Sequence, residues 1–465
     1  MLWFALALAC APSGSLVVVG GGSTGGGTGG GTVETTPPVP PAPETTSADF
    51  AVTDVTAEVH PEMGSIVVVT WQQSGNGSLH LEYSVDDGVW LQSPPTYRGA
   101  GPQRELALGV PYGSRVTWRL TGPAYTSPDA EIEVDPLPNG VPEVSSLTAE
   151  AGLQDATPYF LISLAEQELF GDPWWVMIVD RQGRTVWASK SPSRRVSMHS
   201  RVARDGRSLL LDRNSYWAIF DASFGTVDRV NIEGEVLHTY ETPGLHHPLT
   251  DLPDGSIAWG ATTGGYQNEY IDVVHDDGST ERLFDCEAWL AEIGQNDFCM
   301  SNTLSYHEET NRLMFSLFST ETVLQLDRDT GEVVRYFGHA PGAYDFSPRD
   351  SAFWWQHGGY ITDTGTLLVS SDLSAQGEET IVREYAIDDA AQELVEVWNF
   401  GIGQGVYGYQ MGEAVRLPGG NTLHNYGEGA RLREATPDQQ VVWDIRWDSN
   451  AIGRSMPIQD LYLLR

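Results

Sequence analysis

Two stretches of the chain place a histidine at the same spacing before a turn. His247 precedes the turn glycine Gly255 and His357 precedes Gly365, so aligning the two glycines also aligns the two histidines. Imidazole is reactive near neutral pH, where it serves as a nucleophile, a hydrogen-bond donor or a metal ligand. Two imidazoles at one position of a repeat therefore indicate a site to which several parts of the chain contribute.

The elements that must position these histidines recur along the chain. An acidic residue or Asn, followed shortly by Gly in most cases, leads into a short strand that ends in an aromatic residue. This pattern occurs six times at a period of about 50 residues. The aromatic residues are Trp187, Tyr240, Phe284, Phe337, Trp398 and Trp443. A second hairpin lies between these, which gives four strands per period and predicts a six-bladed β-propeller.

A propeller would bring the repeat positions together, because the innermost strand of every blade lines the central axis. We therefore expect His247 and His357 to face one space, although each histidine alone is equally explained as a strand cap or a packed side chain. Further residues at that level are Met198 or His199, Asn302 and Gly412. We expect the segment 457–464 to close the ring by joining the blade that contains 174–178, which leaves no free sheet edge.

Composition supports an all-β chain. The 465 residues include 50 Gly, 15 Trp and 18 Tyr, and short apolar or alternating runs are separated by Asp-Gly and Asn-Gly turn signals. The formal net charge of −37 argues against a nucleic-acid partner, whose phosphates would be repelled. An anionic ligand would need a local positive pocket within this acidic surface.

The N-terminus resembles the signal of an exported lipoprotein. Residues 1–10 are apolar and end at Cys10, which would be lipidated and would anchor the protein to a membrane. A plain short signal peptide or a misassigned start explains the same residues. Residues 11–47 are rich in Gly, Ser, Thr and Pro and predict a flexible tether. Periplasmic or surface localisation follows from this interpretation.

Two folded domains are expected after the tether. Residues 48–139 contain short strands with hairpin turns and predict a β-sandwich of the immunoglobulin or fibronectin-III type, with Trp71 and Trp118 in its core. Residues 140–465 form the predicted propeller. If Cys10 is lipidated, Cys286 and Cys299 remain as a pair, which fits a disulfide in an oxidising compartment. A metal site is the weaker alternative for them, because no second Cys or His pair stands at ligand spacing nearby.

From about residue 150 to its end, the chain resembles the bacterial arylsulfotransferases. The resemblance rests on five stretches: His246-His247 before 252–255, Asn302 to Tyr306, 323–331, Gln356-His357 before 365–368, and 412–423. It implies a β-sandwich ahead of a six-bladed propeller. It also implies transfer of a sulfuryl group from a phenolic sulfate ester to a phenol in the periplasm, without a cofactor.

The resemblance assigns roles to individual residues. The histidine after Gln is the nucleophile, so this role falls on His357. His246 or His247 and Asn302 would donate hydrogen bonds to the sulfuryl oxygens, where preorganised donors count most. Gln356 and Trp355 are the other predicted substrate-binding residues, with Trp355 in the wall of an aryl pocket; packing in the blade core is the alternative for that tryptophan.

Three positions depart from the family pattern. Met300 stands in place of a histidine, Phe318 in place of an arginine, and Pro248 in place of an acidic residue. A cation and an imidazole removed from a preorganised site would each forfeit about 2–4 kcal/mol of anion stabilisation. Candidates to supply a cation are the basic segment 190–213, which a solvated face also explains, and Arg383, Arg416 and Arg431.

The departures keep other functions open. A tethered surface propeller without chemistry, acting as a binding or scaffold protein, is the main alternative. A metal site formed by His246, His247 and His357 is a third interpretation, which lacks the carboxylate support that such ligands usually have.

Overall fold

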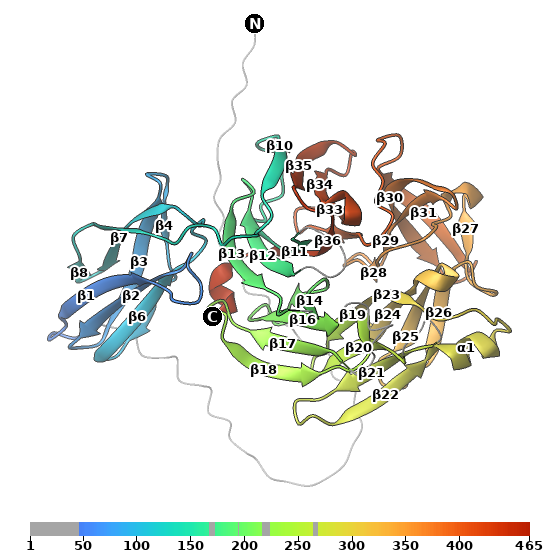
Figure 1. Cartoon of the computed structure of the whole chain (residues 1–465), viewed down its shortest axis with the longest axis horizontal. Helices are drawn as coiled ribbons and strands as arrows, with labels where there is room; N and C mark the ends of the chain where they lie inside the picture. The colour runs from blue at the N-terminus through green and yellow to red at the C-terminus, as the bar shows by residue number, and fades with distance from the viewer. Residues whose placement is uncertain (1–45, 167–172, 194, 216–223, 264–267) are drawn as a thin grey trace, which may run out of the picture. The chain divides into compact units, whose positions relative to one another are not determined.

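The computed structural model describes residues 46–166, 173–193, 195–215, 224–263 and 268–465 (Figure 1). Strands dominate, and the described chain contains a single α-helix, α1 (Cys286–Glu292), so the all-β prediction is confirmed. Cys10 and almost all of the predicted tether fall outside the described residues. Within the described ranges, no helix has the length and apolar character needed to cross a bilayer.

Two sheets occupy residues 52–133, which we call the two-sheet region. The first sheet contains β1 (Val52–Val59), β2 (Val67–Gln73) and β6 (Gly101–Ala107). The second contains β3 (Gly77–Val85), β4 (Trp90–Gln92), β5 (Thr96–Arg98), β7 (Arg115–Gly122), β8 (Tyr125–Thr126) and β9 (Ala130–Glu133).

The two sheets bury a common core. In β3 the side chains alternate, with Leu79, Leu81 and Tyr83 buried and the residues between them partly exposed, as expected for a strand with one face against a core. Leu81 packs with Val69 from the opposite sheet. Trp71 and Trp118 are both buried, as the sequence predicted.

Six more sheets lie within residues 144–458 of the described chain, which we call the six-sheet region (Figure 1). The first contains β36 (Ile452–Ile458), β11 (Tyr159–Ala165), β12 (Trp174–Asp180) and β13 (Thr185–Lys190). The second contains β14 (Arg195–Val196), β15 (Arg201–Val202), β16 (Leu209–Ser215), β17 (Thr226–Val230) and β18 (Val236–Glu241). The third contains β19 (Leu245–Asp251), β20 (Ile257–Thr262), β21 (Glu269–Val274) and β22 (Thr280–Asp285).

The other three sheets repeat this plan. The fourth contains β23 (Ser301–His307), β24 (Arg312–Leu317), β25 (Thr322–Asp327) and β26 (Val333–Gly338). The fifth contains β28 (Gly359–Ile361), β29 (Leu367–Ser374), β30 (Gly377–Asp388), β31 (Glu393–Phe400) and β27 (Asp345–Ser347). The sixth contains β32 (Glu413–Arg416), β33 (Thr422–Asn425), β34 (Arg431–Ala435), β35 (Val441–Trp447) and β10 (Val144–Ala149). Short 3-10 turns are η1 (Phe318–Thr320), η2 (Arg349–Ser351), η3 (Gly427–Gly429) and η4 (Leu461–Leu464).

The recurring acidic turns predicted from the sequence join the third and fourth strands of each predicted four-strand unit. Between β12 and β13, for example, the Gly183 amide donates to the Asp180 carbonyl at 2.9 Å, with Gly183 at φ +74°. This left-handed conformation is open to glycine at little cost. The aromatic residue that ends the next strand is buried in most of the sheets, as with Trp187 and Trp443.

In the third and fourth sheets the last strand is more exposed than the strands before it. In the third sheet every residue of β19 and β20 is buried, whereas β22 is largely exposed. The first strands also contact one another, through β15 with β36, β19 with β23, β23 with β28, and β32 with β36. A hydrogen bond from Arg201 of β15 to the Leu249 carbonyl of β19 (2.7 Å) links the second and third sheets.

The C-terminal strand joins the start of the six-sheet region. β36 pairs with β11 in the sheet that also holds Trp174, so the predicted sheet is the one that is joined. The joining residues are Ile452–Ile458 rather than 457–464, because the Asp460 side chain accepts a hydrogen bond from the Tyr462 amide and the chain turns into η4. Gly453 permits the close approach of β36, since a Cβ there would lie 1.9 Å from the Met198 carbonyl oxygen.

Candidate functional site

A cavity of about 210 Å³ lies where the six sheets meet. Each sheet, or the segment beside its first strand, contributes lining residues. In sheet order these include Arg454, His199, His247, Asn302, His357 and Glu413. The cavity therefore collects side chains that are far apart in the sequence, as the repeat register predicts.

The shared register has a local cause in the hairpin turns. The Gly255 amide donates to the Leu252 carbonyl at 3.0 Å, and the Gly365 amide donates to the Thr362 carbonyl at 2.8 Å. Both glycines have positive φ, +88° and +80°. Equal turns fix equal spacings along the preceding strands, so His247 and His357 reach the same level and line one cavity.

The ring of His357 is held in one tautomer. Its Nδ1–H donates to the Trp355 carbonyl oxygen at 3.0 Å. A carbonyl can only accept, so the neutral ring carries its lone pair on Nε2. Burial lowers the pKa of His357 to about 4, against the opposing effect of the Trp355 carbonyl. At neutral pH the side chain is therefore an uncharged imidazole with a free Nε2 lone pair.

The segment before His357 adopts an uncommon backbone conformation. Trp355 has φ +48°, a region that bulky L-residues rarely occupy. Its indole N–H donates to the Ala375 carbonyl at 3.1 Å, and the Asn302 amide group donates to the Gln356 carbonyl at 2.5 Å. These contacts hold the strained residue in place and aim its carbonyl at the histidine ring.

Gln356 does not line the cavity, although we predicted it to bind substrate. Its side chain is buried, and its Nε2 donates to the Leu317 carbonyl at 2.9 Å and to Ser316 Oγ at 3.3 Å. Its contacts with β24 direct the amide away from the cavity. The residue anchors the backbone on which His357 stands.

His199 places a second neutral imidazole in the cavity. Its ring centroid lies 4.9 Å from that of His247, edge to face. Burial, with a smaller contribution from Arg454, holds the pKa of His199 well below its usual value. Within the described part of the chain, neither ring nitrogen of His199 has a hydrogen-bond partner, although the residue is only 6% exposed.

A buried carboxylate fixes the backbone at this histidine. Asp212 accepts hydrogen bonds from the Met198 amide at 3.0 Å and from the His199 amide at 3.1 Å. Met198 packs into an apolar cluster, which leaves His199 as the member of the predicted pair that lines the cavity.

His246 lies behind His247 rather than in the cavity. The two ring centroids are 3.7 Å apart, His246 is buried, and burial lowers its pKa to about 3. The cavity lining does not include it. The catalytic role predicted for His246 therefore stays a prediction, without a contact to the cavity.

Arg454 is the one Lys or Arg among the described residues that line the cavity. Its Nη1 donates to Glu413 Oε2 at 2.7 Å, and the other carboxylate oxygen accepts from the Ser455 amide at 2.6 Å. Sequence reasoning missed it, because Arg454 belongs to no motif and enters the site only through the pairing of β36 with β11. The arginines proposed from sequence are paired elsewhere: Arg383 with Glu396, Arg416 with Glu384, and Arg431 with Asp444.

Two residues at departures from the family pattern form an apolar wall. Phe318 and Met300 both line the cavity. The Phe318 ring centroid lies 5.2 Å from that of His357 and 5.4 Å from that of Trp355. This part of the lining is therefore apolar.

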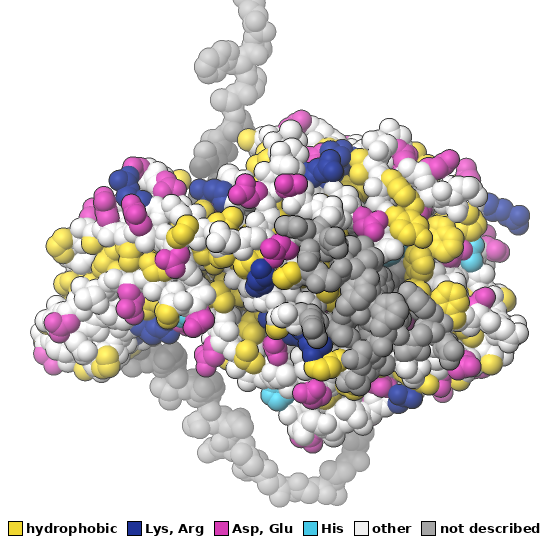
Figure 2. Space-filling model, in the orientation of Figure 1, with side chains coloured by type: hydrophobic (Ala, Val, Ile, Leu, Met, Phe, Trp, Pro, Cys, Tyr) yellow, Lys and Arg dark blue, Asp and Glu magenta, His cyan; other side chains and the backbone are white. Residues whose placement is uncertain are grey.

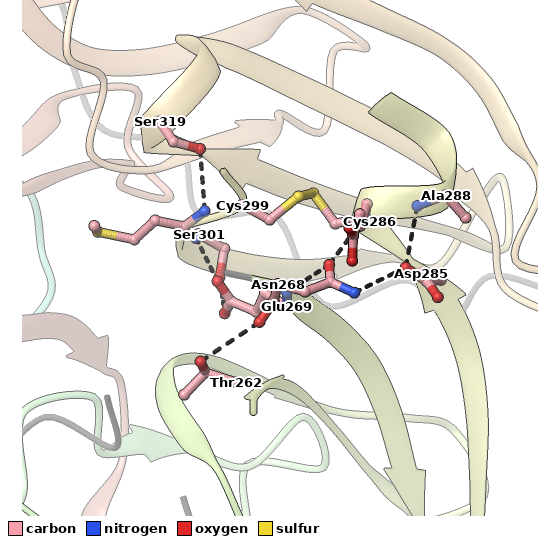
Figure 3. The surroundings of a disulfide bond; sticks show 11 residues. Thr262, Asn268, Glu269, Asp285, Cys286, Ala288, Cys299, Ser301 and Ser319 are labelled. Carbon is pink, nitrogen blue, oxygen red and sulfur yellow. Dashed lines mark hydrogen bonds between the residues drawn. A yellow bond between two sulfur atoms is a disulfide. The ribbon is translucent and has the colours of Figure 1, made fainter. Parts of the chain in front are cut away.

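A disulfide anchors the strand that carries Asn302 (Figure 3). Cys286 and Cys299 are bonded, the pair predicted from the sequence, and Cys299 directly precedes the cavity-lining residues Met300 to Asn302. The Ser301 amide donates to Glu269 Oε2 at 2.6 Å, and burial raises the pKa of Glu269 to about 7. Helix α1, the disulfide and Glu269 together fix where β23 begins.

Within the described ranges, no group of three or more His, Cys, Asp and Glu residues is arranged to hold a metal ion. The histidine cluster therefore does not have the geometry of the metal site considered from the sequence. On the face seen in Figure 2, acidic and basic side chains are interspersed.

No protein-family model matches the sequence, and no curated protein matches it. Among solved structures, a protein of unknown function from Bacteroides caccae aligns over 65% of this chain and 100% of its own, with 14% identity and a TM-score of 0.44. A catalytically inactive virginiamycin B lyase from Staphylococcus aureus with quinupristin aligns over 67% and 99%, with 13% identity and a TM-score of 0.39. Hydrazine synthase from Kuenenia stuttgartiensis aligns over 57% and 71%, with 15% identity and a TM-score of 0.37.

Proposed function

We propose that the six-sheet region is a six-bladed β-propeller and that the two-sheet region is an immunoglobulin- or fibronectin-III-like sandwich. The contacts that pass from one first strand to the next and return through β36 support the propeller. The common core of the two opposed sheets supports the sandwich.

We propose that the cavity transfers a sulfuryl group between phenols, with His357 as the nucleophile. The observation that carries this proposal is the hydrogen bond from His357 Nδ1–H to the Trp355 carbonyl, in a ring whose pKa is about 4. A neutral imidazole with a fixed tautomer is ready to attack through Nε2 without first losing a proton.

In the first half-reaction the Nε2 lone pair attacks the sulfur of an aryl sulfate. The bond from sulfur to the aryl oxygen breaks, and its electron pair leaves with the oxygen as a phenolate. The Nε2–S bond then makes a sulfohistidine that retains its proton on Nδ1. Positive charge develops on the ring, so the hydrogen bond to the Trp355 carbonyl is stronger in the transition state than in the ground state.

The second half-reaction returns the enzyme to its starting state. The oxygen of an acceptor phenol attacks sulfur, the Nε2–S bond breaks, and its electron pair returns to Nε2. The acceptor proton passes through solvent to the phenolate released earlier. The low pKa of His357 assists this step, because a weakly basic nitrogen is the better leaving group.

The sulfuryl oxygens need hydrogen-bond donors in both steps. Arg454 supplies a guanidinium, and the neutral rings of His199 and His247 each carry one N–H. Glu413 balances the charge of Arg454 and orients it through the 2.7 Å ion pair. These groups come from other sheets than the Met300 and Phe318 positions, where the family pattern would place the imidazole and the cation.

Incubating the protein with phenyl sulfate and no acceptor tests the mechanism. We expect a burst of one phenol per protein and a mass increase of one SO₃ group on the peptide that contains His357, which adding an acceptor phenol removes. The His357→Ala variant should show neither. Turnover without a burst, or a burst that survives this substitution, would rule out His357 as the nucleophile.

A non-catalytic binding role is the second candidate. The Arg454–Glu413 ion pair cancels the charge of the cation, and Phe318 and Met300 make part of the lining apolar. Both features suit an uncharged aromatic ligand. A protein that binds phenol but releases none from phenyl sulfate, 4-nitrophenyl sulfate or other activated esters would favour this role.

We also propose that the protein is exported and anchored through a lipid at Cys10, with residues 11–47 as a tether. Mass analysis of the N-terminal peptide from the membrane fraction tests this, and a Cys10→Ser variant should move to the soluble exported fraction. An unmodified Cys10 in the mature protein would contradict it.

A further inference from the structure

Large aromatic side chains stand exposed at the mouth of the cavity. Tyr409 lines the cavity and is 61% exposed. Trp355, 37% exposed, contacts Phe318, which is also part of the lining. Single exposed apolar side chains are ordinary, but a group that continues a cavity marks a binding surface.

Contacts hold the Trp355 ring and the backbone beside Tyr409 in place. The Trp355 indole is fixed by its bond to the Ala375 carbonyl and by the Phe318 ring at 5.4 Å. Beside Tyr409, the Gly408 amide donates to Thr380 Oγ1 at 2.9 Å, and a Cβ on Gly408 would lie 2.1 Å from the Tyr426 carbonyl oxygen. An aromatic ring that is already fixed, such as that of Trp355, loses little entropy when a ligand stacks on it.

The cavity behind these rings is small. Its volume of about 210 Å³ is below the range of roughly 300–1,000 Å³ typical of sites for drug-sized ligands. The unpartnered polar atoms, the His199 ring nitrogens and Asn302 Oδ1, belong to buried residues of this inner space. A ligand that places one ring and one polar group there has room to grow only toward the mouth.

We infer that the site is built for phenols that carry a second aromatic ring. The phenolic ring lies in the cavity against Phe318, and the outer ring stacks on Tyr409 and Trp355 at the mouth. This inference rests on the proposed function for the identity of the inner group. The stacking itself requires no sulfuryl transfer and can be measured separately.

The test compares equilibrium binding of 4-phenylphenol and phenol by calorimetry. In the wild-type protein we expect 4-phenylphenol to bind at least tenfold more tightly. In Tyr409→Ala this ratio should fall about fivefold, the size of one aromatic contact. Tyr409→Phe keeps the ring and should keep the ratio. Trp355→Gly, which retains the left-handed backbone, should lower it by a similar factor.

Trp90→Ala is the matched control, because Trp90 is 41% exposed and lies in the two-sheet region. It should leave the ratio unchanged. Equal affinities for the two phenols in the wild-type protein, or a ratio that Tyr409→Ala does not lower, would overturn the inference. Tighter binding of 4-phenylphenol than of phenol, with no sulfuryl transfer, would refute the proposed function alone. Sulfuryl transfer with equal affinities for the two phenols would refute the outer-ring site alone.

Discussion

The two-sheet and six-sheet regions treat buried polar groups differently. Among the described residues 52–133, every buried side-chain nitrogen and oxygen has a hydrogen-bond partner. In the six-sheet region several buried polar atoms have none, including both ring nitrogens of His199, Asn302 Oδ1 and Gln410 Oε1, and all three residues line the cavity. Other exceptions, such as Trp174 Nε1 and Trp447 Nε1, do not line the cavity. Buried polar groups are normally satisfied, so the exceptions at the cavity are the ones that a ligand bound there could pair.

This difference in the pairing of buried polar atoms indicates that the two-sheet region contributes mainly to stability and the six-sheet region to binding. Residues whose polar atoms are all paired contribute to folding. Residues that keep unpaired polar atoms lower the stability of the free protein and recover that free energy when a ligand pairs them. The predictions below change one region at a time.

The largest effect is expected at His357. Replacing it by Asn keeps a polar side chain and removes the nucleophile, so we expect kcat/KM for phenyl sulfate to fall by about 10³-fold or more. The free energy of unfolding should fall by only about 1 kcal/mol, the size of the lost hydrogen bond to the Trp355 carbonyl. The control is His307→Asn, which alters a histidine that contacts Thr310 outside the cavity. An equal loss of kcat/KM in this variant would show that the loss is not specific to the cavity.

Trp71→Ala should act in the opposite way. The side chain is 1% exposed in the core of the two-sheet region, and its removal should lower the free energy of unfolding by about 3–5 kcal/mol. Folded protein should keep its wild-type kcat/KM, since Trp71 does not line the cavity. Denaturant titration measures the first quantity. Val89→Ala, at a residue 84% exposed, should change neither.

His199→Leu should raise stability while it lowers activity. The variant removes a buried imidazole with two unpartnered nitrogens, so we expect the free energy of unfolding to rise by about 1–2 kcal/mol. The loss of one donor should lower kcat/KM about 10²-fold.

Ser93→Ala is the counterpart in the two-sheet region. Ser93 is fully buried, and its Oγ accepts from the Leu81 amide at 2.9 Å. We expect this variant to lose about 1–2 kcal/mol, because a buried amide loses its partner. If both variants destabilise equally, unpaired polar atoms do not distinguish the two regions.

The smallest effect concerns pH. With a pKa of about 4, His357 stays neutral through the neutral range, so its titration should leave kcat/KM flat there and lower it only as the pH falls through about 4. Protonation at low pH removes the Nε2 lone pair. Burial causes the low pKa, so Phe318→Ser, which opens the wall to water, should move the acid limb toward higher pH. An acid limb that stays in place would show that burial by Phe318 is not the cause.

The features that could be predicted from the sequence are those that local turns control. Hairpin glycines such as Gly183 and Gly255 set strand lengths and spacing, so the recurring strands, the shared level of His247 and His357, and the buried tryptophans of the two-sheet region could all be read from the chain. These features depend on residues a few positions apart.

The rest depends on packing between distant segments. The side chain of Gln356 donates to β24, and His246 is not among the lining residues although His247 is. Arg454 lies on a strand whose partner, β11, is near the start of the six-sheet region. Trp355 has a left-handed backbone conformation, which a sequence normally signals by a glycine, and no glycine stands at this position. The residues next to these positions in the sequence do not indicate any of these placements.

The position of β36 has a consequence for how the cavity is assembled. Its residues Gly453 and Arg454 supply the guanidinium and part of the wall, and they follow every histidine of the cavity in the sequence. A nascent chain that ends before Ile452 already holds every histidine of the cavity but lacks the cation. The cavity is therefore complete only when β36 has paired with β11, and loss of that strand would leave the histidines without the guanidinium.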